Sequence, residues 1–349
     1  LDHVTEINLD ERGWISSLST EKSGELKADL YVDCTGFKAF LIKKMGVSYT
    51  SYQDLLINNA AWASRVPYVD PNAEVDLVTN CTGIENGWVW NTPLWSRIGT
   101  GYVYSDKFID EEGALKEFQK HIGHGDELDY NHIEIKNGVH DKAWHKNCIA
   151  LGLSYGFIEP LESTGLVFLV EGIDRLVIAL QTRDRHINQF DRDCVNRENR
   201  IQLDYTKYFV GFHFYGGIRD DTEYWRYYTQ ELEQEDHWLD TPNDMLTFIT
   251  TRKDEPQGLS RARFTRFDSR SFTDGTLCVA VGHHMNLYTD YIRKKLSDYG
   301  TGWSNDKQLF NAELNEIFKY WWHRNERINK LADHSPTHYE YLKENIYEV

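Results

Sequence analysis

The chain has 349 residues, and its 55 acidic against 38 basic residues give a formal net charge of −17. That charge argues against nucleic acid or an anionic membrane as the main partner, because both require a basic surface. Aromatic residues make up 14% of the chain, which excludes a disordered or low-complexity protein. The length allows one large domain or two ordinary ones, with a sizeable core in either case.

Cysteine and histidine content argues against disulfides and metals. The five cysteines are odd in number and have no C-x-x-C spacing (Cys34, Cys81, Cys148, Cys194 and Cys278). We therefore expect a reducing, cytoplasmic compartment. The 14 histidines form no ligand pattern, so no metal site is predicted. The most apolar long stretch, Gly165–Leu180, contains three charged residues and falls short of the ~20 apolar residues that a membrane span needs.

The first 45 residues predict strands followed by a short helix. Val4–Leu9 and Trp14–Leu18 alternate apolar and polar residues around a D-E-R-G turn, and Ala28–Asp33 is typical of a more buried strand. Phe37–Met45 is predicted to be helical. A small meander that leads into a buried strand is therefore expected.

The rest of the chain divides into a mixed part and a helical part. Residues 54–104 predict strands, Glu111–Ile122 a helix and Ala143–Leu153 strand structure. In the helix predicted for Gly165–Leu180, apolar residues recur at helical spacing, with a Glu171–Arg175 pair on the other face. Long helices follow, predicted for residues 188–212, 221–238, 287–299 and 311–332. We expect a mixed α/β lobe over residues 1–180 and a mainly helical lobe over residues 181–349.

Two segments of the α/β part have residue types that are typical of a cofactor-binding site. A-D-L-Y-V-D-C-T-G-F places Asp33 and Gly36 directly after a buried strand, which is a usual way to bring backbone close to a nucleotide. In isolation a plain strand-to-helix turn is the better interpretation. G-W-V-W-N-T-P puts Trp88 and Trp90 on one face of a strand, where they either wall a channel or fill a core.

The third segment, F-I-E-P-L-E-S-T-G, leads into the apolar helix. Two carboxylates, a serine and a threonine gather at a helix N-terminus, where open N–H groups and the helix dipole attract anions. In isolation, ordinary capping by Ser163 or Thr164 is the better interpretation of this segment, although capping and anion binding can coexist. The chain contains no G-x-S-x-G, P-loop or intact G-x-G-x-x-G motif.

Taken together, these segments resemble the flavin-dependent tryptophan halogenase family. G-W-V-W-N-T-P is similar to that family's W-x-W-x-I-P signature, with Thr92 in place of Ile, and N-C-I-A-L-G-L-S-Y-G-F-I-E-P-L-E-S-T-G resembles its second flavin and halide segment. G-T-G-Y-V-Y-S-D-K-F and F-H-F-Y-G-G-I-R-D-D-T-E-Y-W-R also match. The resemblance extends from Val4 to about Arg226 and is traceable to residue 347.

The resemblance implies an enzyme in which FADH2, delivered by a separate flavin reductase, reacts with O2 to give a flavin hydroperoxide. A halide attacks it, and the resulting hypohalous acid travels through a tunnel to a small, electron-rich aromatic substrate of the indole or phenol type. The implied fold is an incomplete, flavin-monooxygenase-like FAD lobe with a helical substrate lobe, and a homodimer is compatible with it. Implied site residues are Glu162 and Ser163 as the catalytic pair, Thr164 and Gly165 for halide, and Val4, Asp33, Gly36, Trp88, Trp90, Pro93, Leu153 and Leu166 for FAD.

Two departures from the family pattern matter. The G-x-G-x-x-G motif and the catalytic lysine that the family carries upstream are not in these 349 residues. We therefore expect the chain to be the C-terminal part of a halogenase. The paired tyrosine of tryptophan-specific members is also missing from Phe272–Gly282, so tryptophan itself is not secure as the substrate.

Two other functions stay open at this stage. One is a flavin monooxygenase that inserts oxygen, against which the Trp88–Trp90 pair argues. The other is a non-catalytic binding protein that has kept the fold.

Overall fold

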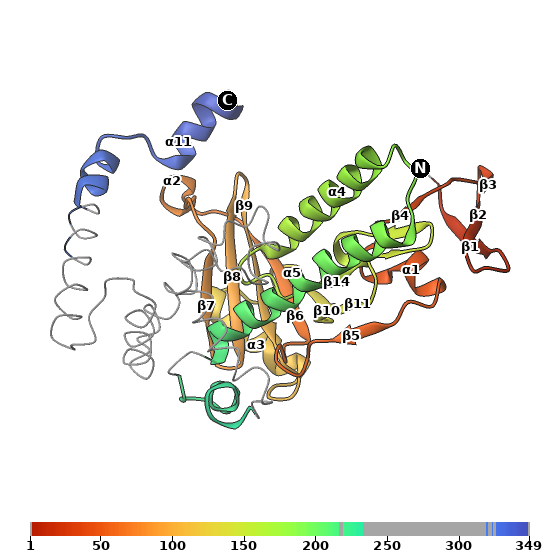
Figure 1. Ribbon diagram of the computed structural model, residues 1–349. Coiled ribbons are helices and arrows are strands. Elements are labelled where there is room, and N and C mark those ends of the chain that lie inside the picture. The colour runs from red at the N-terminus through yellow and green to blue at the C-terminus, as the bar shows by residue number, and fades with distance from the viewer. Residues whose placement is uncertain (1, 216–218, 233–318, 320–322, 324–325, 348–349) are drawn as a thin grey trace, which may run out of the picture. The chain divides into compact units, whose positions relative to one another are not determined.

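A computed structural model describes residues 2–215, 219–232, 319, 323 and 326–347 (Figure 1). Its described residues form two compact units. Unit 1 contains residues 2–59 and 135–213, and unit 2 contains residues 60–134 together with the described residues from 214 onward. Both units therefore combine segments that are distant in the sequence. The predicted division into lobes at residue 180 stays a prediction.

Strands in unit 1 form three small sheets. Their orders are β1-β2-β3, β14-β11-β5 and β12-β13-β4. The strands are β1 (Val4–Leu9), β2 (Ile15–Thr20), β3 (Gly24–Leu26), β4 (Tyr31–Asp33), β5 (Tyr49–Ser51), β11 (Gly138–His140), β12 (Trp144–His145), β13 (Cys148–Ala150) and β14 (Gly156–Phe157). The predicted pairing of the first two strands is confirmed, and Gly13 at a φ of 73° makes the turn between them. The third strand of this sheet is Gly24–Leu26, which was not predicted, whereas the predicted strand at Ala28–Asp33 forms β4 in another sheet.

Short helical segments lie between these strands, and two long helices follow the last strand. The short segments are η1 (Gly36–Lys38), α1 (Phe40–Lys44) and η2 (Gly152–Ser154), and the long helices are α4 (Thr164–Thr182) and α5 (Gln189–Tyr215), whose last residues fall in unit 2. β4 and β13 run parallel, pairing Val32 with Ile149. The turn after β4 and η2 after β13 therefore both lie at the carboxyl ends of the pair.

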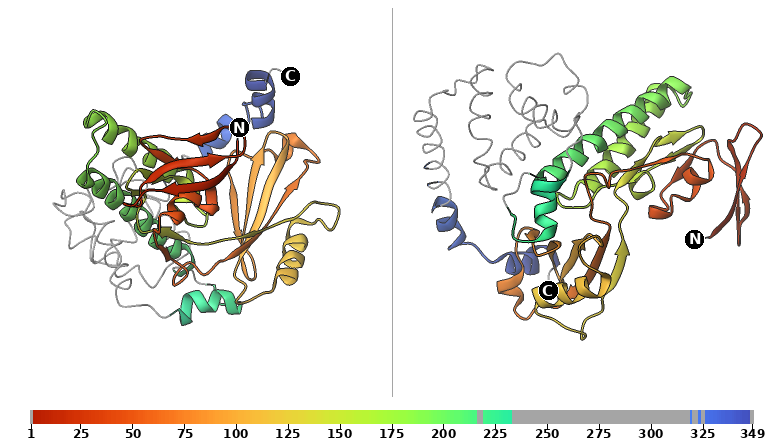
Figure 2. Two further views of the ribbon diagram at one scale, coloured as in Figure 1. Left: turned by 90° about the vertical axis from the view of Figure 1, so that its right-hand side faces the viewer. Right: turned by 90° about the horizontal axis from the view of Figure 1, so that it is seen from below.

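α4 and α5 lie side by side (Figure 2) and share a core with the β12-β13-β4 sheet. Trp144, Ile149 and Leu151 of the sheet segment pack there with Leu176 of α4 and Val195 of α5. The two helices also share a polar contact, because the Arg175 guanidinium donates to the side chains of Asn199 (2.5 Å) and Gln202 (2.7 Å).

The orientation of α4 differs from the usual expectation for an amphipathic helix. The predicted Glu171–Arg175 pair forms, but both side chains are largely buried. The exposed side instead carries apolar residues at helical spacing, namely Leu166, Val170, Ile173 and Val177. Periodicity located the helix correctly, but the charged pair, held by Asn199 and Gln202, occupies the packed side.

Unit 2 is built on a five-stranded antiparallel sheet of order β10-β6-β9-β8-β7. The strands are β6 (Ala60–Val66), β7 (Asn80–Gly83), β8 (Gly87–Leu94), β9 (Arg97–Tyr104) and β10 (Asn131–Glu134). α3 (Glu111–Ile122) has the predicted bounds; Asp110 caps its start and Gly123 ends it. Ala114 and Phe118 of α3 pack on Val89, Tyr102 and Tyr104 of the sheet.

The remaining described elements of unit 2 are short helical segments. They are α2 (Pro71–Glu74), α6 (Glu223–Arg226), the π-helix η3 (Tyr227–Glu231), α11 (His338–Leu342) and the π-helix η4 (Lys343–Tyr347). The helix predicted for residues 188–212 forms as α5, and within the prediction for 221–238 the described helical residues begin at Glu223. The helices predicted for residues 287–299 and 311–332 lie wholly or mostly outside the described residues. The mixed α/β class is confirmed.

Candidate functional site

The loop between β14 and α4 is fixed at its start by a buried acid. Glu159 is fully buried; its Oε2 accepts from Nδ2 of Asn58 (2.8 Å), and its backbone N–H donates to Oδ1 of Asn137 (2.8 Å). Pro160 then begins a turn that the N–H of Ser163 closes by donating to the Pro160 carbonyl (3.1 Å). The residues that follow are therefore presented on a defined backbone.

The N-terminus of α4 is not capped by the side chains that the sequence offers. Ser163 occupies the N-cap position at a left-handed φ of 54°, and its side chain makes no capping hydrogen bond. The Thr164 Oγ1 is buried without a partner among the described residues. A Cβ placed on Gly165 would meet nothing within 4 Å. The predicted capping is therefore wrong, and the first N–H groups of a 19-residue helix lack a side-chain acceptor there.

Glu162 is held by a histidine from the far end of α5. Nε2 of His213 lies 2.9 Å from Oε1 of Glu162, within hydrogen-bond distance. The Glu162 side chain is 44% exposed, whereas that of His213 is 12% exposed. One carboxylate oxygen is thus held by the protein, while the side chain stays accessible.

Sequence reasoning missed His213. The segment that contains it resembles the family, but 51 residues separate this histidine from Glu162. No local pattern marks such a contact. Asn58 and Asn137, which hold Glu159, were missed for the same reason.

Two leucines beside this loop expose apolar surface. Leu166, in the first turn of α4, is 72% exposed, and Leu153, in η2, is 42% exposed. Exposed leucines on rigid elements suit contact with a planar apolar ring. Val4 on β1 is also exposed. These three residues have accessible surface for the flavin contacts that the resemblance implies.

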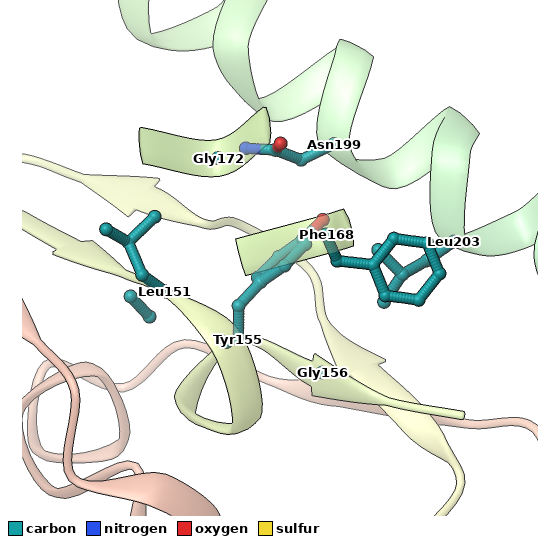
Figure 3. A pocket seen from close by; sticks show the side chains of 9 residues that line it. Leu151, Tyr155, Gly156, Phe168, Gly172, Asn199 and Leu203 are labelled. Carbon is teal, nitrogen blue, oxygen red and sulfur yellow. The ribbon is translucent and has the colours of Figure 1, made fainter. Parts of the chain in front are cut away.

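A very small cavity lies behind η2, between Tyr155, Phe168 of α4, and Asn199 and Leu203 of α5 (Figure 3). Its volume of about 10 Å³ leaves room for one water molecule at most. Burial raises the pKa of the Tyr155 phenol well above its ordinary value. This cavity is packing space that seats α4 against η2, and it is too small for an organic ligand.

Asp33 stabilises the turn that follows β4. Its Oδ1 accepts from the N–H (3.0 Å) and hydroxyl (2.7 Å) of Thr35, and its Oδ2 accepts from the N–H groups of Leu41 (2.8 Å) and Ile42 (3.0 Å). These bonds hold the turn and the start of α1. Gly36 follows at a φ of 68°, and a Cβ there would meet nothing within 4 Å. Contact of Asp33 or Gly36 with a cofactor stays a prediction.

The tryptophan pair belongs to unit 2. The rings of Trp88 and Trp90 lie on one face of β8, with centroids 6.1 Å apart. Trp88 is buried, as the core interpretation requires, while Trp90 is partly exposed and covers Gly101 of β9. Pro93 lies beyond the stretch of β8 that pairs with β7, where a missing N–H costs no ladder bond. Their predicted place beside the flavin stays a prediction.

Neither a metal cluster nor a membrane-spanning helix was found within the described residues. No group of three His, Cys, Asp or Glu side chains there is arranged to hold an ion. No helix in the same part of the chain combines the length and hydrophobicity that crossing a membrane requires. The Phe272–Gly282 segment, from which the tyrosine pair is missing, lies outside the described residues.

These features define a mixed α/β protein in which an uncapped helix N-terminus follows a histidine-held carboxylate. The chain belongs to the tryptophan halogenase family, whose model matches residues 1–280. It is 39% identical over 228 residues to the 7-chloro-L-tryptophan 6-halogenase KtzR of Kutzneria sp. (strain 744), covering 65% of this chain and 44% of the relative. Identity to the tryptophan 6-halogenase SttH of Streptomyces toxytricini is also 39%, covering 65% and 43%.

Superposition on solved structures supports the family assignment. The crystal structure of SttH superposes with a TM-score of 0.77 at 30% identity, covering 98% of this chain and 65% of that one. The VirX1 apo structure gives a TM-score of 0.75 at 32% identity, covering 99% and 64%. The sequence matches cover less than half the length of these curated relatives, and the superpositions cover less than two thirds of the solved chains. KtzR and SttH are named halogenases, and the family assignment of this chain is confirmed.

Proposed function

We propose that the protein is a flavin-dependent halogenase that uses FADH2, O2 and a halide to modify an electron-rich aromatic molecule. The observation that supports this most directly is the uncapped N-terminus of α4, located in the segment that resembles the family's halide site. Bound reduced flavin would supply the electrons that activate O2 for oxidation of the halide to hypohalous acid. A separate reductase would deliver the FADH2.

Thr164 and Gly165 would hold the halide. The Thr164 hydroxyl, which has no partner in the described part of the chain, and the open space at Gly165 fit a spherical anion. The dipole of a 19-residue helix also favours negative charge at this end. Leu153 and Leu166 would contact the isoalloxazine ring, and Val4 the adenine side of FAD, because all three expose apolar surface in unit 1.

Glu162 would act on the substrate side, with Ser163 beside it. A carboxylate suits either orientation of the halogenating agent or removal of the proton from the halogenated ring. The hydrogen bond from His213 would fix one of its oxygens and leave the other for this work. Trp88, Trp90 and Pro93 would form a wall that keeps the substrate from direct oxygenation.

The relatives' names point to the substrate class. KtzR and SttH are named for L-tryptophan or its chlorinated form. We therefore propose that the substrate is an indole, with tryptophan as the first candidate. Phenols are the other class of electron-rich aromatic to test.

The test is a halogenation assay with the full-length protein, FAD, a flavin reductase, bromide or chloride, and a panel of indoles and phenols. Mass spectrometry would detect the halogenated product. Glu162→Gln is expected to lose at least about 100-fold in turnover, whereas Glu112→Gln, an exposed residue on α3, should match wild type. An oxygenated product, with full turnover in Glu162→Gln, would instead identify a monooxygenase. Thr164→Val should raise the KM for halide while flavin binding is retained.

A further inference from the structure

Unit 1 contains a second cavity, of about 740 Å³. It lies at the end of the parallel strands β4 and β13 opposite to the one that carries η2. Asp29 and Leu30, just before β4, and Asn147, just before β13, contribute to its wall, so it lies at the amino ends of those strands. Leu180, in the last turn of α4, also lines it. Sixteen residues of helix separate Leu180 from Thr164, a rise of about 24 Å. The cavity is therefore separate from the candidate halogenation site.

A buried cation, Arg192 of α5, lines this cavity. The residue is only 9% exposed; its Nε donates to the Lys146 carbonyl (2.7 Å), and its guanidinium lies 5.3 Å from the centroid of the Trp14 ring. Its acidic neighbours are engaged elsewhere, since Asp191 pairs with Arg183 (2.8 Å) and Asp193 accepts from Gln189 (2.8 Å). Within the described residues, the terminal nitrogens of Arg192 have no protein acceptor.

The rest of the wall adds positive charge near Arg192. Lys146 and Arg185 also line the cavity, and no acid of the described residues forms an ion pair with Arg185. The lining acids, Asp29 and Asp184, are both exposed, whereas the arginine of α5 is buried. The charges of Asp191 and Asp193 stabilise the guanidinium of Arg192, but within the described residues neither forms an ion pair with it. Its terminal nitrogens are therefore available to an anion. The arrangement is suited to an anion.

The apolar part of the wall is aromatic. Trp14 and Trp144 line the cavity together with Leu30, Leu180 and Ile187. The Trp144 Nε1 is buried and donates to no acceptor among the described residues. A volume of 740 Å³ falls within the range of small-molecule sites, which combine apolar walls with a few placed charges.

We propose that this cavity is a ligand site, separate from the candidate halogenation site, for a planar aromatic molecule that carries a carboxylate or a phosphate. The indole rings would contact the aromatic part, and Arg192, with Arg185, would bind the anionic group. Such a ligand could be a small aromatic acid or a nucleotide, and both present the same chemistry to this wall.

Isothermal titration calorimetry on the full-length protein tests the proposal. The probes are indole-3-acetate and AMP, with the neutral indole-3-acetamide and adenosine as their counterparts. We expect at least one anion to bind at least about tenfold more tightly than its neutral counterpart, and the tighter anion identifies the source. Absence of binding by both anions, or equal binding of each anion and its neutral counterpart, overturns the proposal.

Variants then locate the site. Arg192→Gln and Arg185→Gln should each weaken binding of the anion, by about tenfold for the buried residue. Arg185 is exposed, so its variant decides the matter if the other fails to fold. Arg197→Gln, an exposed arginine on α5 that does not line the cavity, and Glu162→Gln should bind like wild type. Unchanged affinity in a folded Arg192→Gln or in Arg185→Gln, or a matching loss in Glu162→Gln, overturns the assignment.

Discussion

Nε2 of His213, near the end of α5, lies 2.9 Å from Oε1 of Glu162, in the loop before α4. The loop is thereby held at two points, because the fully buried Glu159 fixes its start through Asn58 and Asn137. His213 thus engages one carboxylate oxygen of Glu162 and leaves the other for contact with the substrate or the halogenating agent. This gives His213 a positioning role in the proposed reaction.

The role of His213 predicts a difference between two substitutions. His213→Gln keeps an amide donor near the position of Nε2 and should retain much of the halogenated product per FADH2 consumed. His213→Leu removes the donor and should lower that ratio by about tenfold, since a hydrogen bond to a charged group is worth roughly 1.5–3 kcal/mol. Mass spectrometry of the product alongside FADH2 consumption measures it. Equal ratios in the two variants would contradict the positioning role.

The buried Glu171–Arg175 pair predicts a large stability loss when one partner is removed. The side chains are 6% and 12% exposed, and Arg175 also donates to Asn199 and Gln202. Glu171→Leu should lower the free energy of unfolding by about 3–5 kcal/mol, because it leaves a buried guanidinium without its counter-charge. Denaturant titration measures the loss.

A matched control exists in the exposed pair of α3. Glu112 and Lys116 have the same i,i+4 spacing but side chains that are 79% and 70% exposed. Glu112→Leu should therefore cost no more than about 1 kcal/mol. Similar losses from the two substitutions would show that burial is not what strengthens the pair in α4.

Close contact between Trp90 and Gly101 makes a packing prediction for unit 2. A Cβ on Gly101 would lie 2.0 Å from the Trp90 ring and 2.7 Å from the Trp62 carbonyl oxygen. Gly101→Ala should therefore displace the ring and destabilise the protein by about 1–3 kcal/mol. Gly99→Ala, two residues earlier on β9, has its nearest atoms at 3.7 Å or beyond and serves as the control. Melting temperatures that fall equally in both variants would refute this account of the contact.

A buried histidine predicts a pH dependence of stability. Burial lowers the pKa of His140 below its ordinary value of 6.5, and its Nδ1 lies 3.2 Å from the Ser48 carbonyl oxygen. The unfolded chain therefore takes up a proton at a higher pH than the folded one, so stability falls as pH decreases through 6.5. For a single histidine the loss between pH 7 and 5.5 is at most about 1 kcal/mol.

The check is denaturant unfolding at both pH values for wild type and His140→Asn, which keeps a donor for Ser48. The loss on acidification should shrink in the variant. It should not vanish, because burial also lowers the pKa of His145. An identical pH dependence in the variant and wild type would contradict the prediction.

The sequence by itself determined the local elements and the family. α3 has the predicted bounds because its signals are local: Asp110 at the cap, helical periodicity and Gly123 at the end. The pairing of β1 with β2 and the shared face of Trp88 and Trp90 follow from a period of two residues. The halogenase resemblance likewise rested on contiguous motifs, and the family model confirmed it.

Only the tertiary structure decided which neighbours those elements meet. Periodicity located α4 but did not reveal that Asn199 and Gln202 of α5 would hold its charged pair in the packed side. The sequence favoured capping by Ser163 or Thr164, and the left-handed backbone at Ser163 removed it. His213 reaches Glu162 across 51 residues, and Arg192 meets Trp14 across a still longer separation. Such contacts depend on the packing of whole elements, which no short stretch of sequence encodes.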